Sequence, residues 1–372
     1  MTDPVCGPDR RRVLGWAAVG AGLSLLPGSL ALAEPMSLEQ RIGQMLLLGF
    51  IGSTVDTDGA DQIAGHLAAG RIGGVLFLRH NVRTRDGVEG LTARFRAIAP
   101  EAWMAVDQEG GVVQRLSRDL GYGAVPRALL VAQAGDADAA RAVYAAAALE
   151  FRAAGFNMNL APVADLNDPE NAVIGRHGRA YGDDGATVAA YASAFIGAFR
   201  ETGAVCAIKH FPGHGHSRGD SHAGFVDITA TWSDAELDPF RRLIDAGQAR
   251  LIMCGHLTQR GLDPADVPVT FSAPVIEDLL RGELGFDGVV MTDDLDMAAI
   301  RENYSQREAV LRSIEAGNDI IMLSNSAAPD PELPQRIVGW VSEAITEGRL
   351  TEARIDQSVA RIAALRLPAA MP

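Results

Sequence analysis

The sequence predicts an α/β protein folded as a single (β/α)8 TIM-type barrel, and two observations support this fold. Eight short apolar runs recur along the chain, each followed by a polar or glycine-rich loop and then by a helical pattern. The runs are almost continuously apolar, as is typical of parallel strands that are buried on both faces. Eight such units in roughly 335 residues fit one barrel, although a doubly wound open sheet would give a similar set of strands.

The first clear helix lies between the third and the fourth of the eight apolar runs. This helix is the alanine-rich stretch Ala139–Ala154, with Asp138 as its expected N-cap and Gly155 as its C-terminal stop. The eight expected strands are Met45–Phe50, Gly74–Leu78, Trp103–Val106, Asn157–Val163, Val205–Ile208, Leu251–Cys254, Gly288–Met291 and Asp319–Leu323.

Further helical spacing occurs in Asp234–Ala246 and Pro274–Arg281. The last segment, Glu352–Leu365, is expected to close the structure with one apolar stripe, formed by Ile355, Val359 and Ile362. The chain contains no short-period repeat and no low-complexity linker, which favours one domain over two.

Composition excludes several classes of protein. The chain has 372 residues and a net charge of −14, which argues against a nucleic-acid-binding protein with a basic face. The 3 cysteines are too few for a disulfide scaffold. Cys206 and Cys254 lie in apolar runs and are expected to be buried thiols, with a disulfide as the alternative.

The first 33 residues have the pattern of an export signal. Arg10, Arg11 and Arg12 precede the apolar stretch Val13–Leu26, and a small-residue site ends at Ala33. The paired arginines resemble the twin-arginine signal. We therefore expect residues 1–33 to be a signal peptide, residues 34–372 to be the catalytic domain, and the mature protein to be periplasmic or secreted without stable membrane insertion. An uncleaved anchor, or a cytoplasmic protein whose signal is not used, is the alternative.

In a barrel of this type, functional residues follow the carboxyl ends of the strands. The loop after the third expected strand runs from Asp107 to Arg115 and contains two acids and two glycines, and glycines allow a ligand to approach the backbone. Asp107 is a candidate acceptor for a ligand hydroxyl. Arg179, in a later loop, is expected either to bind a carboxylate or hydroxyls or to form a surface ion pair.

The segment from Lys209 to His222 has the densest concentration of reactive side chains. It holds four of the 8 histidines and the only lysine of the chain, Lys209, beside His210. Asp220 lies two residues before His222, and a carboxylate bonded to one ring nitrogen raises the basicity of the other. This pattern favours proton transfer by His222. A metal site made by the histidines, or a glycine-rich loop with incidental histidines, is the alternative.

Three acids, Asp293, Asp294 and Asp296, follow the seventh expected strand. Asp293 comes first after the strand and is best placed to face the mouth of the barrel as a nucleophile or a metal ligand. Asp294 and Asp296 are expected to cap the helix that follows.

These motifs together resemble those of the glycoside hydrolase family 3 β-N-acetylglucosaminidases. The resemblance rests on Lys209-His210-Phe211-Pro212-Gly213-His214-Gly215 with Asp220-Ser221-His222. It also rests on three further blocks in the family's order, which begin at Asp107, Gly178 and Leu284. The match runs from about Leu38 to Leu367, and it implies one barrel domain without a second α/β domain.

The resemblance implies a role for each matching residue. Asp293 would be the nucleophile, and His222, paired with Asp220, the acid/base of a double displacement with retention. The positions that would contact the terminal N-acetylglucosamine are Asp107, Arg115, Arg179, Lys209 and His210. The resemblance implies no metal and no organic cofactor, and we expect a monomer that acts on carbohydrate.

Three other functions remain open from the sequence. A phosphorylase or transglycosylase could use the same covalent intermediate, and phosphate-dependent product formation would identify the phosphorylase. A metal-dependent barrel hydrolase would be sensitive to chelators. A periplasmic sugar-binding protein would keep the pocket without turnover, but the retained acids and His222 argue against it. The leaving group, a muropeptide sugar or a chitooligosaccharide, is not determined by the sequence.

Overall fold

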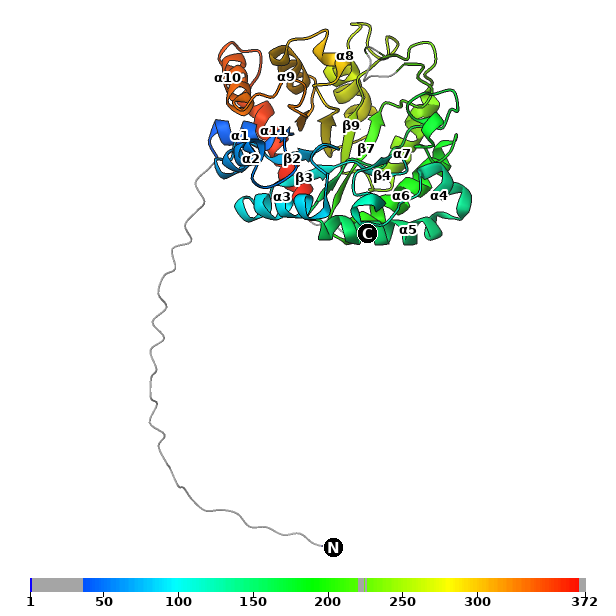
Figure 1. Cartoon of the computed structure of the whole chain (residues 1–372). Coiled ribbons are helices and arrows are strands. Elements are labelled where there is room, and N and C mark those ends of the chain that lie inside the picture. Colours follow the sequence, from blue (N-terminus) through cyan, green and yellow to red (C-terminus); the bar gives the residue numbers. More distant parts are fainter. Residues whose placement is uncertain (2–35, 220–223, 225, 368–372) are drawn as a thin grey trace. The chain divides into compact units, whose positions relative to one another are not determined.

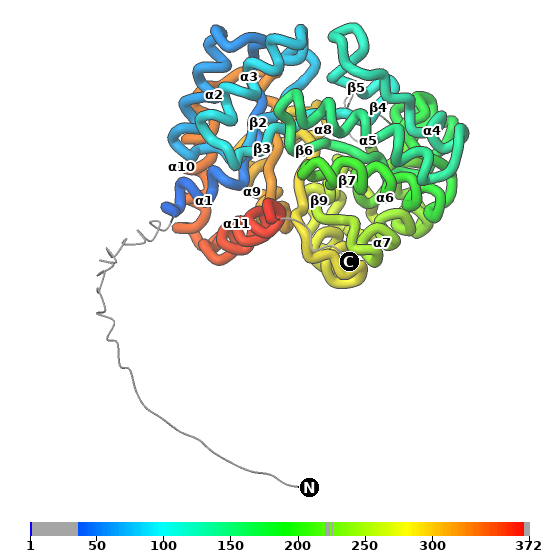
Figure 2. The backbone as a smooth tube through the Cα atoms, turned by 90° about the horizontal axis from the view of Figure 1, so that it is seen from below, coloured from blue at the N-terminus to red at the C-terminus, as the bar shows by residue number. Residues whose placement is uncertain are grey.

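The computed structural model describes Met1 and residues 36–219, 224 and 226–367 of the chain. Its centre is an eight-stranded parallel sheet with the strand order β11-β9-β7-β6-β3-β2-β1-β12. A bridge between Met291 and Ile320 joins the two outer strands, so that the sheet is nearly closed into a barrel. Figure 2 shows helices around the strands. The predicted (β/α)8 TIM-type barrel is confirmed, and the open-sheet alternative is wrong.

All eight predicted strands are present in the barrel; β1, β2, β6 and β12 are shorter than predicted, and β7 is longer. Two small sheets, β4 with β5 and β8 with β10, lie outside the barrel. The strands are β1 Leu46–Leu48, β2 Gly74–Phe77, β3 Trp103–Val106, β4 Gln108–Gly110, β5 Val113–Gln114, β6 Met158–Asn159, β7 Val205–Phe211, β8 Val226–Asp227, β9 Leu251–Cys254, β10 Leu257–Thr258, β11 Val289–Thr292 and β12 Ile321–Leu323.

Helices follow most of the barrel strands. The helix α1, which precedes β1, packs beside α10 and α11, the last two helices of the described chain (Figure 1). The α-helices are α1 Leu38–Gln44, α2 Asp58–Ala68, α3 Arg85–Ile98, α4 Ala128–Ala134, α5 Ala137–Ala153, α6 Gly185–Glu201, α7 Asp238–Asp245, α8 Ala298–Arg301, α9 Gln306–Glu315, α10 Leu333–Thr346 and α11 Glu352–Arg366. Short 3-10 turns are η1 Arg118–Leu120, η2 Gly175–His177, η3 Asp234–Leu237 and η4 Val269–Phe271.

The predicted helices are present, but their boundaries differ in ways that have local causes. The N-cap of α5 is Asp136 rather than the predicted Asp138, because the Asp136 carboxylate accepts a hydrogen bond from the backbone N–H of Ala139. The predicted helix at 234–246 consists of η3 followed by α7, which has Pro239 in its first turn, where proline costs no hydrogen bond. Pro274–Glu283, labelled η5, is a π-helix rather than an α-helix.

The core of the barrel unit is formed by the strands and the inner faces of the helices. Phe77, the last residue of β2, has edge-to-face ring contacts with Phe50, which follows β1, and with Phe156, which precedes β6. The predicted stripe of α11 is confirmed at Ile355 and Ile362, which are buried, whereas Val359 is half-buried.

Cys206 and Cys254 are both buried free thiols, as predicted. Burial raises the pKa of the Cys254 thiol to about 12, which keeps it protonated and unreactive. Within the described residues, no helix has the length and apolar composition that crossing a membrane requires.

Candidate active site

The carboxyl ends of the barrel strands gather six of the eight predicted site residues. Asp107 follows β3, Lys209 and His210 lie in the second half of β7, and Asp293 follows β11. Arg115 and Arg179 come from the loops that follow β3 and β6. The other two residues, Asp220 and His222, lie outside the described residues.

Lys209 is the centre of a buried group of charged side chains. Its ammonium Nζ lies 2.8 Å from Asp107 Oδ1 and 2.7 Å from Glu109 Oε1, and its side chain is only 4% exposed. The Arg179 guanidinium donates two parallel hydrogen bonds to the Glu109 carboxylate, at 2.7 and 2.8 Å. Arg115 Nη2 lies 3.6 Å from the second carboxylate oxygen of Asp107. We call these five residues the Lys209 cluster.

Within the Lys209 cluster, the charges of Glu109, Arg179 and Lys209 favour one another's ionised forms. Burial alone raises the pKa of Glu109, but the charges of Arg179 and Lys209 outweigh burial and hold this pKa well below its usual range. Burial alone lowers the pKa of Lys209, and the carboxylates of Asp107 and Glu109 raise it above its ordinary value. The alternative of a surface ion pair at Arg179 is therefore wrong, because this pair is buried.

The β4–β5 hairpin carries Glu109 into the Lys209 cluster. Gly110 and Gly111 form its turn with φ of +105° and +59°, conformations that favour glycine. A Cβ atom at Gly110 would lie 2.5 Å from the carbonyl oxygen of Pro126. The close approach predicted at these glycines is thus made by another part of the chain's own backbone, and it positions Glu109.

Asp165 fixes the His210 ring through a hydrogen bond to its Nδ1 atom. Its Oδ2 atom lies 2.7 Å from His210 Nδ1, and its Oδ1 atom accepts hydrogen bonds from the backbone N–H groups of His210 and His214. Burial raises the pKa of Asp165, but attraction to His210 and the hydrogen bonds lower it overall. An ionised Asp165 keeps a proton on Nδ1 of His210, which leaves Nε2 as the acceptor in the neutral ring.

Asp293 is partly buried, and its backbone N–H donates to the carbonyl of Cys254 at the end of the neighbouring strand β9. Burial alone raises its pKa, but attraction to His256 and His210, together with a hydrogen bond from the backbone of Asp294 and the charge of Lys209, lowers it overall. Asp293 is therefore an ionised carboxylate at neutral pH, with an electrostatic connection to His210 and to the Lys209 cluster.

The two acids after Asp293 do not cap the following helix, and this prediction was wrong. The N-cap of α8 is Met297, which has no side-chain cap. Asp294 instead accepts hydrogen bonds from the backbone N–H groups of Asp296 and Ser324. Asp296 accepts from the Ser324 hydroxyl at 3.2 Å. Both acids tie the segment after β11 to the loop after β12, which fixes the backbone around Asp293.

The segment that follows β7 is anchored on both sides before it leaves the described residues. The Asn171 side chain donates to the carbonyls of His214 and Gly215. Glu236, which is 1% exposed, accepts from both the backbone N–H and the ring Nδ1 of His216. The chain therefore enters the 220–223 segment, which contains Asp220 and His222, from a fixed backbone.

Metal ligation was the alternative for this segment. Among the residues that the structure describes, no three His, Cys, Asp or Glu side chains are grouped so that they could hold a metal ion.

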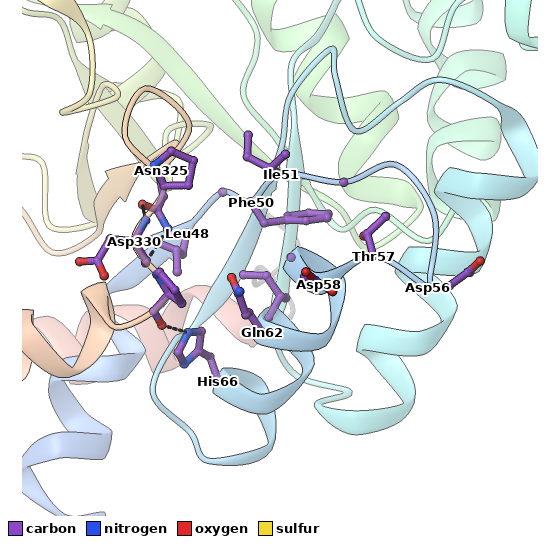
Figure 3. Close-up of a pocket in the computed structure, with 16 residues that line it drawn as sticks. Leu48, Phe50, Ile51, Asp56, Thr57, Asp58, Gln62, His66, Asn325 and Asp330 are labelled. Carbon is purple, nitrogen blue, oxygen red and sulfur yellow. Dashed lines mark hydrogen bonds between the residues drawn. The ribbon is translucent and has the colours of Figure 1, made fainter.

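A cavity of about 580 Å³ opens at the same end of the barrel, between the loops after β1 and β12 (Figure 3). Phe50, Asp58 and Asn325 line it, together with His66, whose Nε2 lies 3.0 Å from the carbonyl of Pro331. None of the predicted sugar-binding residues lines this cavity, which is thus separate from the Lys209 cluster.

Two residues that organise the site were not assigned a role from the sequence. Glu109 lies in the block after the third strand, and Asp165 follows the fourth strand. Each is an acid just after a buried strand, and this position could have marked it as a candidate. A single sequence does not indicate, however, which cation each acid contacts. Only the fold brings Glu109 to Arg179 and Asp165 to His210.

Comparison with known proteins gives one consistent result. Residues 37–365 match the model of the glycosyl hydrolase family 3 N-terminal domain. A β-hexosaminidase of Nitrosomonas eutropha is 32% identical over 330 residues, which cover 86% of this chain and 91% of that protein.

Many solved structures share the fold, among them the following two. A family 3 β-N-acetylglucosaminidase from Paenibacillus has a TM-score of 0.81 and 36% identity, covering 89% of this chain. The present chain spans only 62% of the length of that structure. A β-N-acetylhexosaminidase from Beutenbergia cavernae has a TM-score of 0.79 and 33% identity, over 89% of this chain and 99% of that one.

Proposed function

The chain belongs to glycoside hydrolase family 3 and is a glycoside hydrolase, and from this premise we propose that it is a retaining exo-β-N-acetylglucosaminidase. Its substrates would be peptidoglycan fragments or chitooligosaccharides that end in β-linked N-acetylglucosamine. The named relatives are β-hexosaminidases and β-N-acetylglucosaminidases, which supports this choice of sugar.

The proposed reaction has two displacements. In the first, a carboxylate oxygen of Asp293 attacks the anomeric carbon while His222 gives its proton to the leaving glycosidic oxygen, and a covalent glycosyl–Asp293 ester forms. In the second, His222 takes a proton from water, whose oxygen attacks the same carbon and releases the sugar and the Asp293 carboxylate. Asp220 would hold the His222 ring and favour its protonation.

The Lys209 cluster and His210 would bind the terminal sugar. Asp107 can accept a hydroxyl hydrogen, while Lys209 and Arg115 can donate to hydroxyl or carbonyl oxygens. Within the described residues, Arg115 Nε is buried and has no hydrogen-bond partner. Arg179 would orient the site through Glu109.

The observation that carries the proposal is the pairing of an ionised Asp293 with a cluster of donors at the carboxyl ends of the strands. A nucleophilic carboxylate must be unprotonated at working pH, and the lowered pKa of Asp293 meets this need. The fixed charges of the Lys209 cluster lie at the same end of the barrel, where (β/α)8 enzymes bind their substrates.

The location of the enzyme is part of the proposal. We infer from residues 1–33 that the chain is exported, by the twin-arginine route, and acts as a monomer in the periplasm or outside the cell, after cleavage at Ala33.

Release of p-nitrophenol from its β-N-acetylglucosaminide tests the function. We expect turnover of this substrate and at least about 100-fold less of the β-glucoside. Asp293→Ala should reduce the rate by about 10³-fold or more, since the covalent route is lost. Asp278→Asn, at an exposed carboxylate of the 274–283 helix, is the control and should leave the rate unchanged.

Added azide tests the nucleophile directly. In Asp293→Ala, azide should restore release of p-nitrophenol and convert the sugar to the α-glycosyl azide, because azide attacks the face that Asp293 leaves open. Full activity of Asp293→Ala would overturn the mechanism. Formation of N-acetylglucosamine 1-phosphate in phosphate buffer would identify a phosphorylase instead.

A further inference from the structure

The amino-terminal end of the barrel contains a second cavity, at the opposite end of the strands from Asp293. It has a volume of about 670 Å³ and is lined at the starts of the strands by Trp103, Asn157 and Val205, and by Arg250, which precedes β9. None of the residues of the proposed catalytic site lines it. A ligand in this cavity would therefore not touch the site of glycoside hydrolysis.

The charge of this cavity is unusual for a protein with a net charge of −14. Only two glutamates line it, Glu101 and Glu201, and Glu201 is paired with one of the arginines, Arg141, at 2.6 Å. The six arginines that line the cavity are Arg96, Arg141, Arg152, Arg200, Arg250 and Arg366.

Five of these arginines have no carboxylate partner within the described part of the chain, and their hydrogen bonds there go to neutral groups. Arg152 donates to the carbonyl of Phe156 at 2.7 Å, and Arg200 donates to Gln248 Oε1 at 3.2 Å. Arg250 donates to three carbonyls at the end of α11, each at 2.9 Å. Each guanidinium of the five, half-buried in the cavity wall, thus keeps donors for a further acceptor.

The arginines are close enough to repel one another in pairs. Burial lowers the pKa of Arg152, and the charge of Arg96 lowers it further. Burial also lowers the pKa of Arg250, and the charge of Arg200 adds to this effect. Like charges held together in a half-buried wall raise the free energy of the folded chain unless an anion neutralises them.

Trp103 adds an independent observation. Its side chain is 5% exposed, and its Nε1–H donor is buried without a hydrogen-bond partner among the described residues. The Arg366 guanidinium lies over the Trp103 ring, 5.1 Å from the ring centroid. A buried indole donor beside five guanidinium groups, of which only Arg366 is influenced by the charge of the lining Glu101, fits an acceptor that the described residues do not supply.

We propose that this cavity, which we call the arginine cavity, binds a polyanion of the phosphate class. Guanidinium groups bind phosphoryl oxygens through two parallel hydrogen bonds, and one carboxylate could not neutralise five cations. A compound with two phosphoryl groups carries more charge than inorganic phosphate and should bind more tightly.

Calorimetric titration of the full chain with inorganic phosphate and with pyrophosphate, at constant ionic strength, tests the proposal. We expect one site and about tenfold tighter binding of pyrophosphate. At a concentration of ten times Kd, pyrophosphate should raise Tm by about 2 °C, because the ligand stabilises only the folded chain. Absence of binding by both anions would overturn the proposal.

Matched variants locate the bound anion. Arg96→Gln and Arg200→Gln should each weaken pyrophosphate binding about tenfold, the loss expected for a charged hydrogen bond. Arg307→Gln, at a surface ion pair with Glu343, should leave Kd unchanged. Arg115→Gln should also leave it unchanged, and a loss there would place the anion at the catalytic end and overturn the proposal.

Deletion of residues 368–372 gives the last control, since Leu367 lines the arginine cavity and the chain ends five residues later. Binding that occurs only in the shortened chain would identify the C-terminal carboxylate as the occupant and overturn the proposal. None of these measurements requires turnover, so they stand independently of the proposed function.

Discussion

Basic side chains gather at both ends of the barrel, but the two groups differ in whether their charges have carboxylate partners among the described residues. At the carboxyl end, Lys209 and Arg179 are buried against Asp107 and Glu109, with every contact between 2.7 and 2.8 Å. At the amino end, the arginine cavity holds five guanidinium groups that have no carboxylate partner within the described residues. Lys209 and Arg179 thus have carboxylate partners within the chain, whereas the five arginines of the arginine cavity have none among the described residues.

The amino end is also able to pair its arginines, as Asp319 demonstrates. This carboxylate is 0% exposed and precedes β12, and Arg281 and Arg354 lie 2.8 and 3.4 Å from it. The lack of partners in the arginine cavity is therefore a property of that cavity and not of the end of the barrel. Buried charges persist where they are paired, so an unpaired group of cations indicates an occupant.

The largest effect should come from breaking the paired cluster. Glu109→Gln leaves Arg179 and Lys209 with one carboxylate fewer in a buried site, which should reduce the free energy of unfolding by about 3–5 kcal/mol. Chemical denaturation measures this change. Glu343→Gln, which removes a surface partner of Arg307, should cost less than about 1 kcal/mol. Equal effects of the two substitutions would contradict the contrast between buried and exposed pairs.

The barrel could be predicted from the sequence because its strands are local signals. Each strand, such as β3 or β9, is an apolar run of a few residues whose burial on both faces is visible in composition alone. The candidate residues Asp107 and Asp293 could be singled out for a similar reason, since they directly follow strands, and Lys209 lies in the second half of β7. The resemblance to glycoside hydrolase family 3 is confirmed by the family match over residues 37–365.

Partners across the barrel could not be predicted, because they depend on geometry between distant loops. Nothing in the chain near Asp294 indicates that its carboxylate meets the backbone of Ser324, 30 positions away. A helix cap was the local interpretation, and the tertiary hydrogen bond replaced it. The arginine cavity is a similar case, because its arginines come from α3, α5, α6 and α11 and from the residue before β9.

A smaller effect is expected from pH, which should change the contributions of Asp293 and Asp294 to stability in opposite directions. Burial raises the pKa of Asp294 to about 6. The folded chain then binds this proton more tightly than the unfolded chain, so stability falls as pH rises from about 4 to about 6, by about 2–3 kcal/mol. The pKa of Asp293 is lowered, so its contribution is lost only below the ordinary aspartate pKa. Asp294→Asn should flatten the pH dependence of the denaturation midpoint between 4 and 6; an unchanged slope would contradict the assignment.

The smallest effect, and the sharpest test of the comparison, should come from the arginine cavity itself. Arg96 has one weak hydrogen bond, at 3.4 Å to the carbonyl of Gly155, and it repels Arg152. Without added anion, Arg96→Gln should therefore change the free energy of unfolding by less than about 0.5 kcal/mol, because relief of repulsion offsets the lost contact. Arg281→Gln, which leaves the buried Asp319 with one cation fewer, should be strongly destabilising under the same conditions.

In the presence of pyrophosphate, the difference in destabilisation between Arg96→Gln and Arg281→Gln should narrow. Arg96 then binds the anion, so its removal reduces the free energy of unfolding. Denaturation curves of both variants with and without pyrophosphate measure this change, and a large loss for Arg96→Gln without the anion would mean that the cavity is a structural element in its own right.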